Sequence, residues 1–355
     1  MTTTDSRPAR IDFGRPITTF SIGGVSGRID LRVVSVVTIL AVLTVVVAVV
    51  SLMLGDYHMT LEQIWKAIVG GGDPLDRTVV MNMRMPRITL AVLLGIALGI
   101  SGAIIQSLTK NPLGSPDVIG FNTGAYTGVL LLTLVMHSSD TQKSYAALAG
   151  GILTALAVYL LAYKRGVQGF RLIIVGIAVS AMLSSLNTYL VLVADLDDAM
   201  YAAAWGAGTL NGTQWGQTRA AAVAIAVILV LLLPLSRRMG MLEMGDDAAR
   251  ALGIRTEPTR LALLVLGVAL TAVATAAAGP ISFVALAAPQ LARRLTGSPG
   301  VALIPAAAMG ALMLVFSDVL AERLFAPTKL PVGVVTVSIG GVYLMYLIAR
   351  ESRKQ

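Results

Sequence analysis

Long apolar runs recur along the whole chain, separated by short polar segments. The hydrocarbon core of a bilayer is about 30 Å thick, so roughly 20 apolar helical residues cross it once. Backbone polar groups in lipid must be bonded within the segment, and the runs lack the short alternating strands of a barrel. The pattern therefore predicts an all-α integral membrane protein. Nine runs lie near 33–55, 88–109, 118–139, 144–163, 172–194, 220–236, 261–292, 299–317 and 330–349.

Composition agrees with a membrane location. Of the 355 residues, 56% are hydrophobic and 13% are charged, which the surface of a water-soluble fold of this size would not tolerate. The run at 261–292 is too long for one crossing and contains Gly279-Pro280, a pair that breaks helices. We read it as two short or tilted spans, which gives about ten transmembrane helices.

The distribution of basic residues supports ten spans, because cytoplasmic loops collect Lys and Arg. Nine spans would place the basic residues of the C-terminus outside. Ten spans with both termini in the cytoplasm predict a multi-pass protein of the cytoplasmic (inner) membrane. That arrangement leaves 8 of the 27 basic residues outside, namely Lys66, Arg77, Arg84, Arg87, Lys143, Arg219, Arg323 and Lys329.

Three segments outside the spans stand apart from them. Residues 1–32 are polar and are expected to form a disordered cytoplasmic tail, followed by a single transmembrane domain over 33–355. Residues 56–87 are expected outside the membrane, with a short helix near 60–69. Residues 195–219 carry no charge between Ala199 and Thr218 and read as an interfacial or re-entrant element.

The sequence lacks several kinds of chemistry. Basic residues sit at span ends rather than in a stripe, which argues against nucleic-acid binding, and there is no cysteine. Carriers coupled to ions keep an ionisable group within the membrane. Here the acidic residues fall at predicted span ends or in loops, including Asp117, Asp195, Asp318 and Glu322. No phosphate-binding Gly-x-x-x-x-Gly-Lys-Ser/Thr motif is present either. We predict a non-enzyme without catalytic residues, metal or cofactor of its own, driven by a partner.

One segment, 237–260, is charged and punctuated by glycine between two spans. An acidic pair precedes a helical stretch and Gly253 follows it, which predicts one short cytoplasmic helix. From the residues alone, a solvated connector and a helix that docks into a soluble motor are equally good interpretations.

This segment resembles the coupling segment of the iron-siderophore and cobalamin permease family, the membrane subunits of type II ATP-binding-cassette (ABC) importers. The resemblance covers nearly all of the chain after about residue 35, in ordered segments. These are Arg84-Met85-Pro86-Arg87, Asn111-Pro112-Leu113-Gly114-Ser115-Pro116-Asp117, the coupling stretch from Leu242 to Gly253, Gly279-Pro280-Ile281-Ser282-Phe283 and Leu330-Pro331-Val332-Gly333-Val334-Val335-Thr336. One departure is Pro289-Gln290, where the family often has Pro-His.

The resemblance implies a type II permease fold and import of a ferric siderophore, catecholate and enterobactin-like. It implies a heterodimer with a sister permease, two ATPase subunits that bind ATP and Mg, and an extracytoplasmic substrate-binding protein. A cobalamin or haem permease of the same family remains an alternative. From outside the family, an ion-coupled secondary carrier and an integral membrane enzyme remain weaker ones.

The resemblance also assigns three groups of residues. Docking of the binding protein falls to Arg84, Arg87 and Arg323, and a cytoplasmic gate to Asn111, Leu113, Gln168 and Gly169. Coupling to the ATPase falls to Gly245, Asp246, Asp247, Arg250, Leu252 and Gly253.

Overall fold

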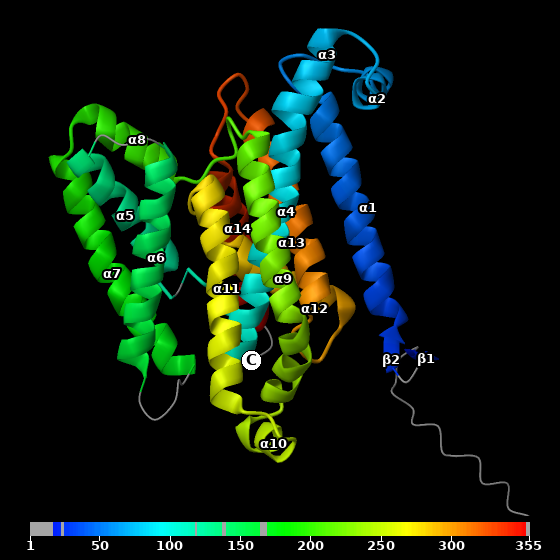
Figure 1. Ribbon diagram of the computed structural model, residues 1–355, viewed down its shortest axis with the longest axis vertical. Coiled ribbons are helices and arrows are strands. Elements are labelled where there is room, and N and C mark those ends of the chain that lie inside the picture. The colour runs from blue at the N-terminus through cyan, green and yellow to red at the C-terminus, as the bar shows by residue number, and fades with distance from the viewer. Residues whose placement is uncertain (1–16, 23–24, 118, 137–139, 164–168, 353–355) are drawn as a thin grey trace, which may run out of the picture.

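The computed structural model describes residues 17–22, 25–117, 119–136, 140–163 and 169–352. Nearly all of this part is helical (Figure 1). The long helices are α1 (Leu31–Met53), α4 (Met85–Thr109), α5 (Phe121–Met136), α6 (Asp140–Ala162), α7 (Gly169–Val193), α9 (Trp215–Glu243), α11 (Thr256–Ala278), α12 (Val284–Thr296), α13 (Leu303–Arg323) and α14 (Val332–Ser352). The short ones are α2 (Leu61–Val69), α3 (Pro74–Thr78), the π-helix η1 (Val79–Arg84), α8 (Leu196–Gly206) and α10 (Asp246–Ala251).

Within the described residues, seven helices are long and apolar enough to cross a membrane: α1, α4, α6, α7, α9, α11 and α13. The helical spanning fold is thereby confirmed. Helices α5, α12 and α14 occupy the other three expected spans, and the full count of ten crossings stays a prediction.

The N-terminal segment is more ordered than expected. Strands β1 (Ile17–Ile22) and β2 (Val25–Asp30) form an antiparallel hairpin. The carboxylate of Asp30 then caps α1 by accepting the backbone N–H groups of Arg32 and Val33. The expectation of a wholly disordered tail through residue 32 is wrong for 17–22 and 25–32, because strand pairing and a helix cap order these residues. Residues 1–16 lie outside the described part.

Helix α4 is the centre of the larger of two helix groups, which it forms with α9, α11, α12 and α13. It is buried along most of its length and packs against α9, α11, α12 and α13. The glycines of its Gly95-x-x-x-Gly99 pattern meet α13, where an added Cβ would collide with the backbone of Gly310 or Ala306. These small residues bring the two helices into backbone contact, which is the intramolecular packing that such a pattern favours.

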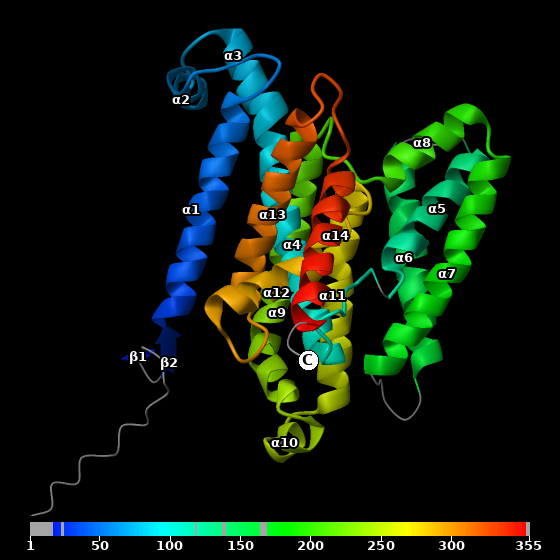
Figure 2. The same ribbon diagram turned by 180° about the vertical axis from the view of Figure 1, so that it is seen from behind.

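A second helix group consists of α5, α6, α7 and α8, and it lies at one side of the molecule (Figures 1 and 2). Helix α1 lies at the opposite side, where it packs on α13. Gly124 and Gly128 of α5 approach the backbone of α6. Helix α6 in turn packs on α11 and joins this group to the larger one.

The long apolar run after residue 260 is broken where its sequence predicts. Helix α11 ends at Ala278, and Gly279 has a φ of +74°, a conformation that suits glycine. Helix α12 then begins at Val284 and has 13 residues. Such a helix spans only about 20 Å, so the break lies within the thickness of the helix bundle.

Another expected element is confirmed, and one boundary is wrong. The outer segment holds α2, which begins with a capping box between Thr60 and Gln63. Residues 195–219 hold the short helix α8, and their interfacial or re-entrant placement stays a prediction. Helix α9, however, runs on through Glu243, so residues 237–243 are helical rather than part of a loop. Gly240 stands in that stretch without ending the helix, and Pro234 is accommodated within it.

Candidate functional site

The chain carries two candidate sites at opposite ends of the bundle: α2 and α3 lie at one end and α10 at the other (Figure 1). The first end is the predicted outer side. There, the Tyr57 hydroxyl donates to Asp76 Oδ1 at 2.8 Å, which raises the pKa of Tyr57. Asp73 caps α3, with Pro74 as the first helical residue. These contacts within the outer segment hold it in one defined arrangement, which we call the outer cap.

Arg84 lies at the end of the π-helix η1. Its guanidinium donates to the backbone carbonyl oxygens of Leu52 and Tyr57. It passes so close to Gly55 that an added Cβ there would collide with it. Arg84 therefore joins the end of α1 to the start of α4, and its donors are engaged within the chain.

Arg87 makes the most ordered ion pair of this end. Its Nε and Nη2 donate to the two carboxylate oxygens of Asp318 at 2.9 and 2.8 Å, and Glu322 lies 3.6 Å from Nη1. Both carboxylates belong to α13, and Asp318 is only 2% exposed. This fork-to-carboxylate pairing is a strong, geometrically specific form of ion pair. It joins the outer ends of α4 and α13.

Arg323 belongs to the same cluster, because its Nη2 lies 3.6 Å from Glu322. Arg84 and Arg87 line one hollow together with Glu322, and Glu322 pairs with Arg87 and Arg323. In this structure they point into their own chain. To dock a binding protein, these arginines would have to leave their partners within the chain and bind the other protein instead. Their docking role stays a prediction.

Asp318 and Glu322 lie in the last two turns of α13, at the end of a span as expected. The helix continues to Arg323, so the expected end of this run at residue 317 is wrong. The apolar pattern placed the end too early because the charged side chains are neutralised inside the bundle.

At the other end, α4 ends at Thr109 and Lys110 adopts a left-handed conformation. Asn111 Oδ1 then accepts the backbone N–H of Leu113 at 2.9 Å, which makes a tight turn. The Leu113 side chain is 55% exposed. The first half of the expected gate is therefore a rigid turn that presents an apolar side chain.

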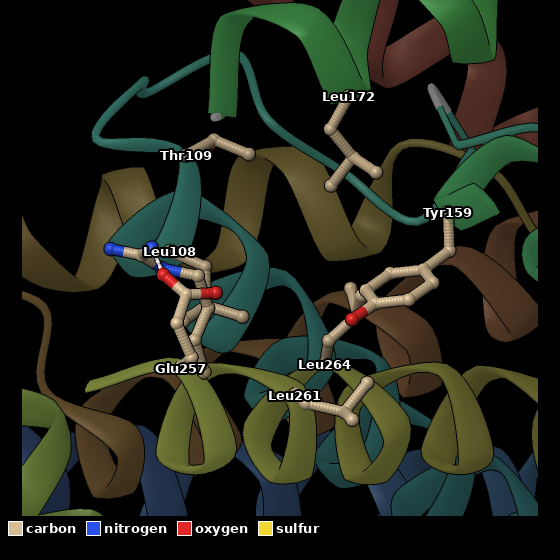
Figure 3. A pocket seen from close by; sticks show the side chains of 8 residues that line it. Leu108, Thr109, Tyr159, Leu172, Glu257, Leu261 and Leu264 are labelled. Carbon is tan, nitrogen blue, oxygen red and sulfur yellow. Dashed lines mark hydrogen bonds and ion pairs between the residues drawn. The ribbon is translucent and has the colours of Figure 1, made fainter. Parts of the chain in front are cut away.

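The second half of the expected gate lies at the start of α7, which begins at Gly169; Gln168 lies outside the described residues. Figure 3 shows a hollow between the ends of α4 and α6 and the starts of α7 and α11. Thr109 and Leu172 both line it. Residues next to the two expected gate segments thus line the same hollow. The gate itself stays a prediction.

Helix α10 forms the expected short helix near the end of the molecule. Gly245, with a φ of +114°, is its N-cap, and Asp246 and Asp247 form its first turn, where acidic side chains favour the helix dipole. Asp246 is therefore the first helical residue rather than the cap. Arg250 in the last turn pairs with Asp247 at 3.1 Å on the exposed face.

The position of α10 is fixed from both sides. Its Ala249 is fully buried in the main core, and Asp246 pairs with Arg260 of α11 at 2.8 Å. Leu252 is 58% exposed, and Gly253, with a φ of +80°, turns the chain into α11. A helix held rigidly on two spans while it exposes apolar and charged groups can transmit the movement of a docked partner.

The structure also shows a polar network that the sequence reasoning missed. Asp117, half-buried in the loop before α5, accepts hydrogen bonds from the Asn122 side-chain amide and from the backbone N–H of Phe283. Thr275 of α11 donates to Asn122 Oδ1 at 2.9 Å. This network connects α5, α11 and α12 at the break. Polar residues inside two apolar runs were the available signal.

Gln290, where the family often has histidine, is part of a second link. Its Nε2 donates to Gln106 Oε1 at 2.6 Å, and Gln106 Nε2 donates to the carbonyl oxygen of Leu286 at 2.9 Å. The glutamine therefore fixes α12 on α4 at this position. Among the described residues, no three potential metal ligands come together, and the absence of a resident metal stays a prediction.

Comparison with known proteins matches these features. The FecCD transport family covers residues 43–350. The ferric enterobactin transport system permease protein FepG of Escherichia coli (strain K12) is 49% identical over 305 residues, which are 86% of this chain and 92% of the relative. The iron(3+)-hydroxamate import system permease protein FhuG of Bacillus subtilis (strain 168) is 37% identical, over 85% of this chain and 93% of the relative.

A solved structure of a metal-chelate type ABC transporter, in an inward-facing conformation, has the same fold. It superposes with a TM-score of 0.79 at 28% identity, over 89% of this chain and 99% of that chain. The architecture is that of the type II importer permeases, a class of multi-pass membrane subunits rather than enzymes. On sequence and on structure, this chain belongs to the FecCD transport family.

Proposed function

We propose that this chain is the permease subunit of an ABC importer that moves a ferric siderophore, catecholate and enterobactin-like, into the cytoplasm. It forms a heterodimer with a sister permease in the inner membrane. Two ATPase subunits, which bind ATP and Mg, dock on α10 and supply the energy. An extracytoplasmic binding protein delivers the substrate at the end that carries α2 and α3.

The observation that carries this proposal is the 49% identity to the ferric enterobactin permease FepG over 92% of that relative's length. The helix α10 supports the mechanism, because it is anchored through Ala249 and Asp246 while Leu252 stays exposed.

A neutral hollow between α5, α7 and α8 supports passage of a large anionic chelate. Its volume is about 480 Å³. Amide, hydroxyl and apolar side chains without charge line it: Asn122, Thr123, Tyr126, Ser184, Asn187, Thr188, Val191, Leu192, Gly206 and Pro280. Conduction requires binding that is weak enough to release the solute. A lining without charge meets that requirement, and selection of the chelate falls to the binding protein.

The direct test is reconstitution of this chain with its sister permease, ATPase and binding protein in proteoliposomes. Uptake of radioactive ferric enterobactin is measured with internal ATP, with a non-hydrolysable ATP analogue, and with a proton gradient alone. We expect uptake only with ATP. Uptake with the proton gradient alone would show a secondary carrier instead.

Competition separates the substrates within the family. Unlabelled ferric enterobactin should reduce the uptake of the label, whereas haem and cobalamin should not. Transport of either of these in place of the siderophore would assign the importer to that substrate. The Asp247→Arg variant serves as the control for coupling, because it reverses an exposed charge on α10.

A further inference from the structure

A second hollow lies at the outer end, apart from the arginine cluster around Glu322. It has a volume of about 600 Å³ and is formed by the segment before α3, by α3 and η1, and by the start of α9. Two arginines from distant parts of the sequence line it, Arg77 and Arg219. The rest of the lining is uncharged: Gly70, Gly71, Gly72, Pro74, Thr78, Met81, Asn82 and Trp215.

Hydrogen bonds fix the position of Arg219 relative to this hollow. The Trp215 indole N–H donates to the carbonyl oxygen of Met81 at 2.6 Å, and the Thr218 hydroxyl donates to the carbonyl oxygen of Pro86 at 3.2 Å. The first turn of α9 is therefore held on η1 and α4. Arg219 lies four residues after Trp215 and shares its helix face. The hollow is a constructed feature of the fold.

Both arginines are exposed. Within the described residues, neither guanidinium has an ion pair or a side-chain hydrogen bond. The acidic side chains on α3 and its cap have other partners, because Asp76 accepts the Tyr57 hydroxyl and Asp73 accepts the backbone N–H of Leu75. Two cations thus face one hollow with their donors available.

The arginines of the Glu322 cluster differ in this respect. Arg84 is bound to backbone carbonyl oxygens, and releasing Arg87 would leave Asp318 buried without its counter-ion. Separation of a buried ion pair is strongly unfavourable, because it leaves an uncompensated charge away from water. A partner that binds Arg77 and Arg219 first meets no such barrier.

We propose that Arg77 and Arg219 form a docking site for an acidic side chain of the extracytoplasmic binding protein. This inference rests on the proposed function, since it requires that partner. Guanidinium groups bind carboxylates through paired N–H donors, and two of them in one hollow suit a single glutamate or aspartate. Helix α3, which contributes to the lining, lies at the extreme end of the bundle (Figure 1), where a soluble protein can reach the hollow.

The test uses the complete complex of permeases and ATPase in lipid nanodiscs, with the binding of the ferric-siderophore-loaded binding protein measured at low and high ionic strength. The double variant Arg77→Glu/Arg219→Glu should lose affinity by about tenfold or more, mainly through slower association, and should lose much of the salt dependence. The variant Arg77→Lys/Arg219→Lys should retain most of the affinity. Co-elution of each variant with the ATPase shows that it has folded.

Lys66→Glu is the matched control. It reverses a charge on the same outer cap, where Lys66 pairs with Glu62 at 2.6 Å, but it leaves the lining of the hollow unchanged. It should weaken binding less than Arg77→Glu alone. Equal effects of these two single variants would overturn the docking site in favour of a diffuse field.

Nanodiscs of purely zwitterionic and of anionic lipid separate the protein partner from a lipid headgroup. The loss in the double variant should be the same in both. A loss confined to anionic lipid would overturn the proposal and assign the arginines to phosphate headgroups. If the wild-type complex fails to bind the loaded binding protein at all, the proposed function fails together with this inference.

Discussion

Single ion pairs decide how the outer end of the molecule is held together. Arg87 and Asp318 stand 231 residues apart in the sequence, yet they form a bidentate contact. The sequence showed an Arg-x-x-Arg pattern beside a span and suggested exposed cations. It could not show that carboxylates from α13 would meet one of them, because that depends on how α4 and α13 pack.

A first prediction concerns this pair. Arg87→Ala should lower the free energy of unfolding by about 3–5 kcal/mol, because Asp318 stays buried without a counter-ion. The double variant Arg87→Met/Asp318→Leu should recover most of the loss, since both charges are removed. Thermal unfolding in detergent micelles measures both. Equal stability of the single variant and the wild type would contradict the structural role.

A second prediction concerns Asp117. Its replacement by Ala removes the acceptor for the Asn122 amide and the Phe283 backbone N–H, with an expected loss of about 1–3 kcal/mol for each unsatisfied donor. Asp117→Asn keeps an acceptor oxygen and should cost less. Limited proteolysis near the break at residue 279 would report the loosening. Identical cleavage rates in wild type and Asp117→Ala would show that the network does not hold the break.

The observed helix boundaries agree with those predicted from the sequence wherever the local capping or helix-breaking signals are strong. The capping residues before α2 and the Gly279-Pro280 break specify their elements through backbone geometry alone. The end of α9 was misjudged because charge marks solvent but does not stop a helix. The hairpin at 17–30 was missed although the sequence carries a hairpin signal, the pair Gly23-Gly24 between two strand-like runs; the polar residues of the segment were interpreted as a tail.

A third prediction belongs to the contact between α4 and α13. Gly95→Leu should prevent folding or reduce its yield strongly, because the added side chain meets the backbone of Gly310. Gly341→Leu is the matched control, since no other group lies within 4 Å of an added Cβ there. Expression as a monodisperse complex measures the outcome. Normal assembly of Gly95→Leu would show that the helices can separate at this point.

A fourth prediction concerns α10. Gly253 has a φ of +80°, which proline cannot adopt, so Gly253→Pro should displace the end of this helix. Gly253→Pro and, as a separate variant, Asp247→Arg should each leave membrane insertion intact, while ATP hydrolysis continues without uptake of the substrate. The ratio of ATP hydrolysed to substrate imported measures coupling. A wild-type ratio in both variants would remove α10 from the coupling role.

The whole molecule combines an apolar bundle with two polar ends. Periodicity and length predicted the bundle because the bilayer restricts the backbone to helices. The motif order predicted the family, which the comparisons confirm. The outer hollow could not be predicted from the sequence, since Arg77 and Arg219, which have no ion-pair partner among the described residues, line the same hollow only when α9 packs on η1. A sequence does not distinguish an arginine whose guanidinium is available to a partner from one that is held in an ion pair within the chain.

The central claim is that this chain is a conduit whose energy comes from a partner ATPase. The most direct measurement is uptake of ferric enterobactin by proteoliposomes that contain either the complete complex or this chain with its sister permease alone. Concentrative uptake by the complete complex, dependent on ATP hydrolysis, is the predicted result. Concentrative uptake without the ATPase would contradict the account.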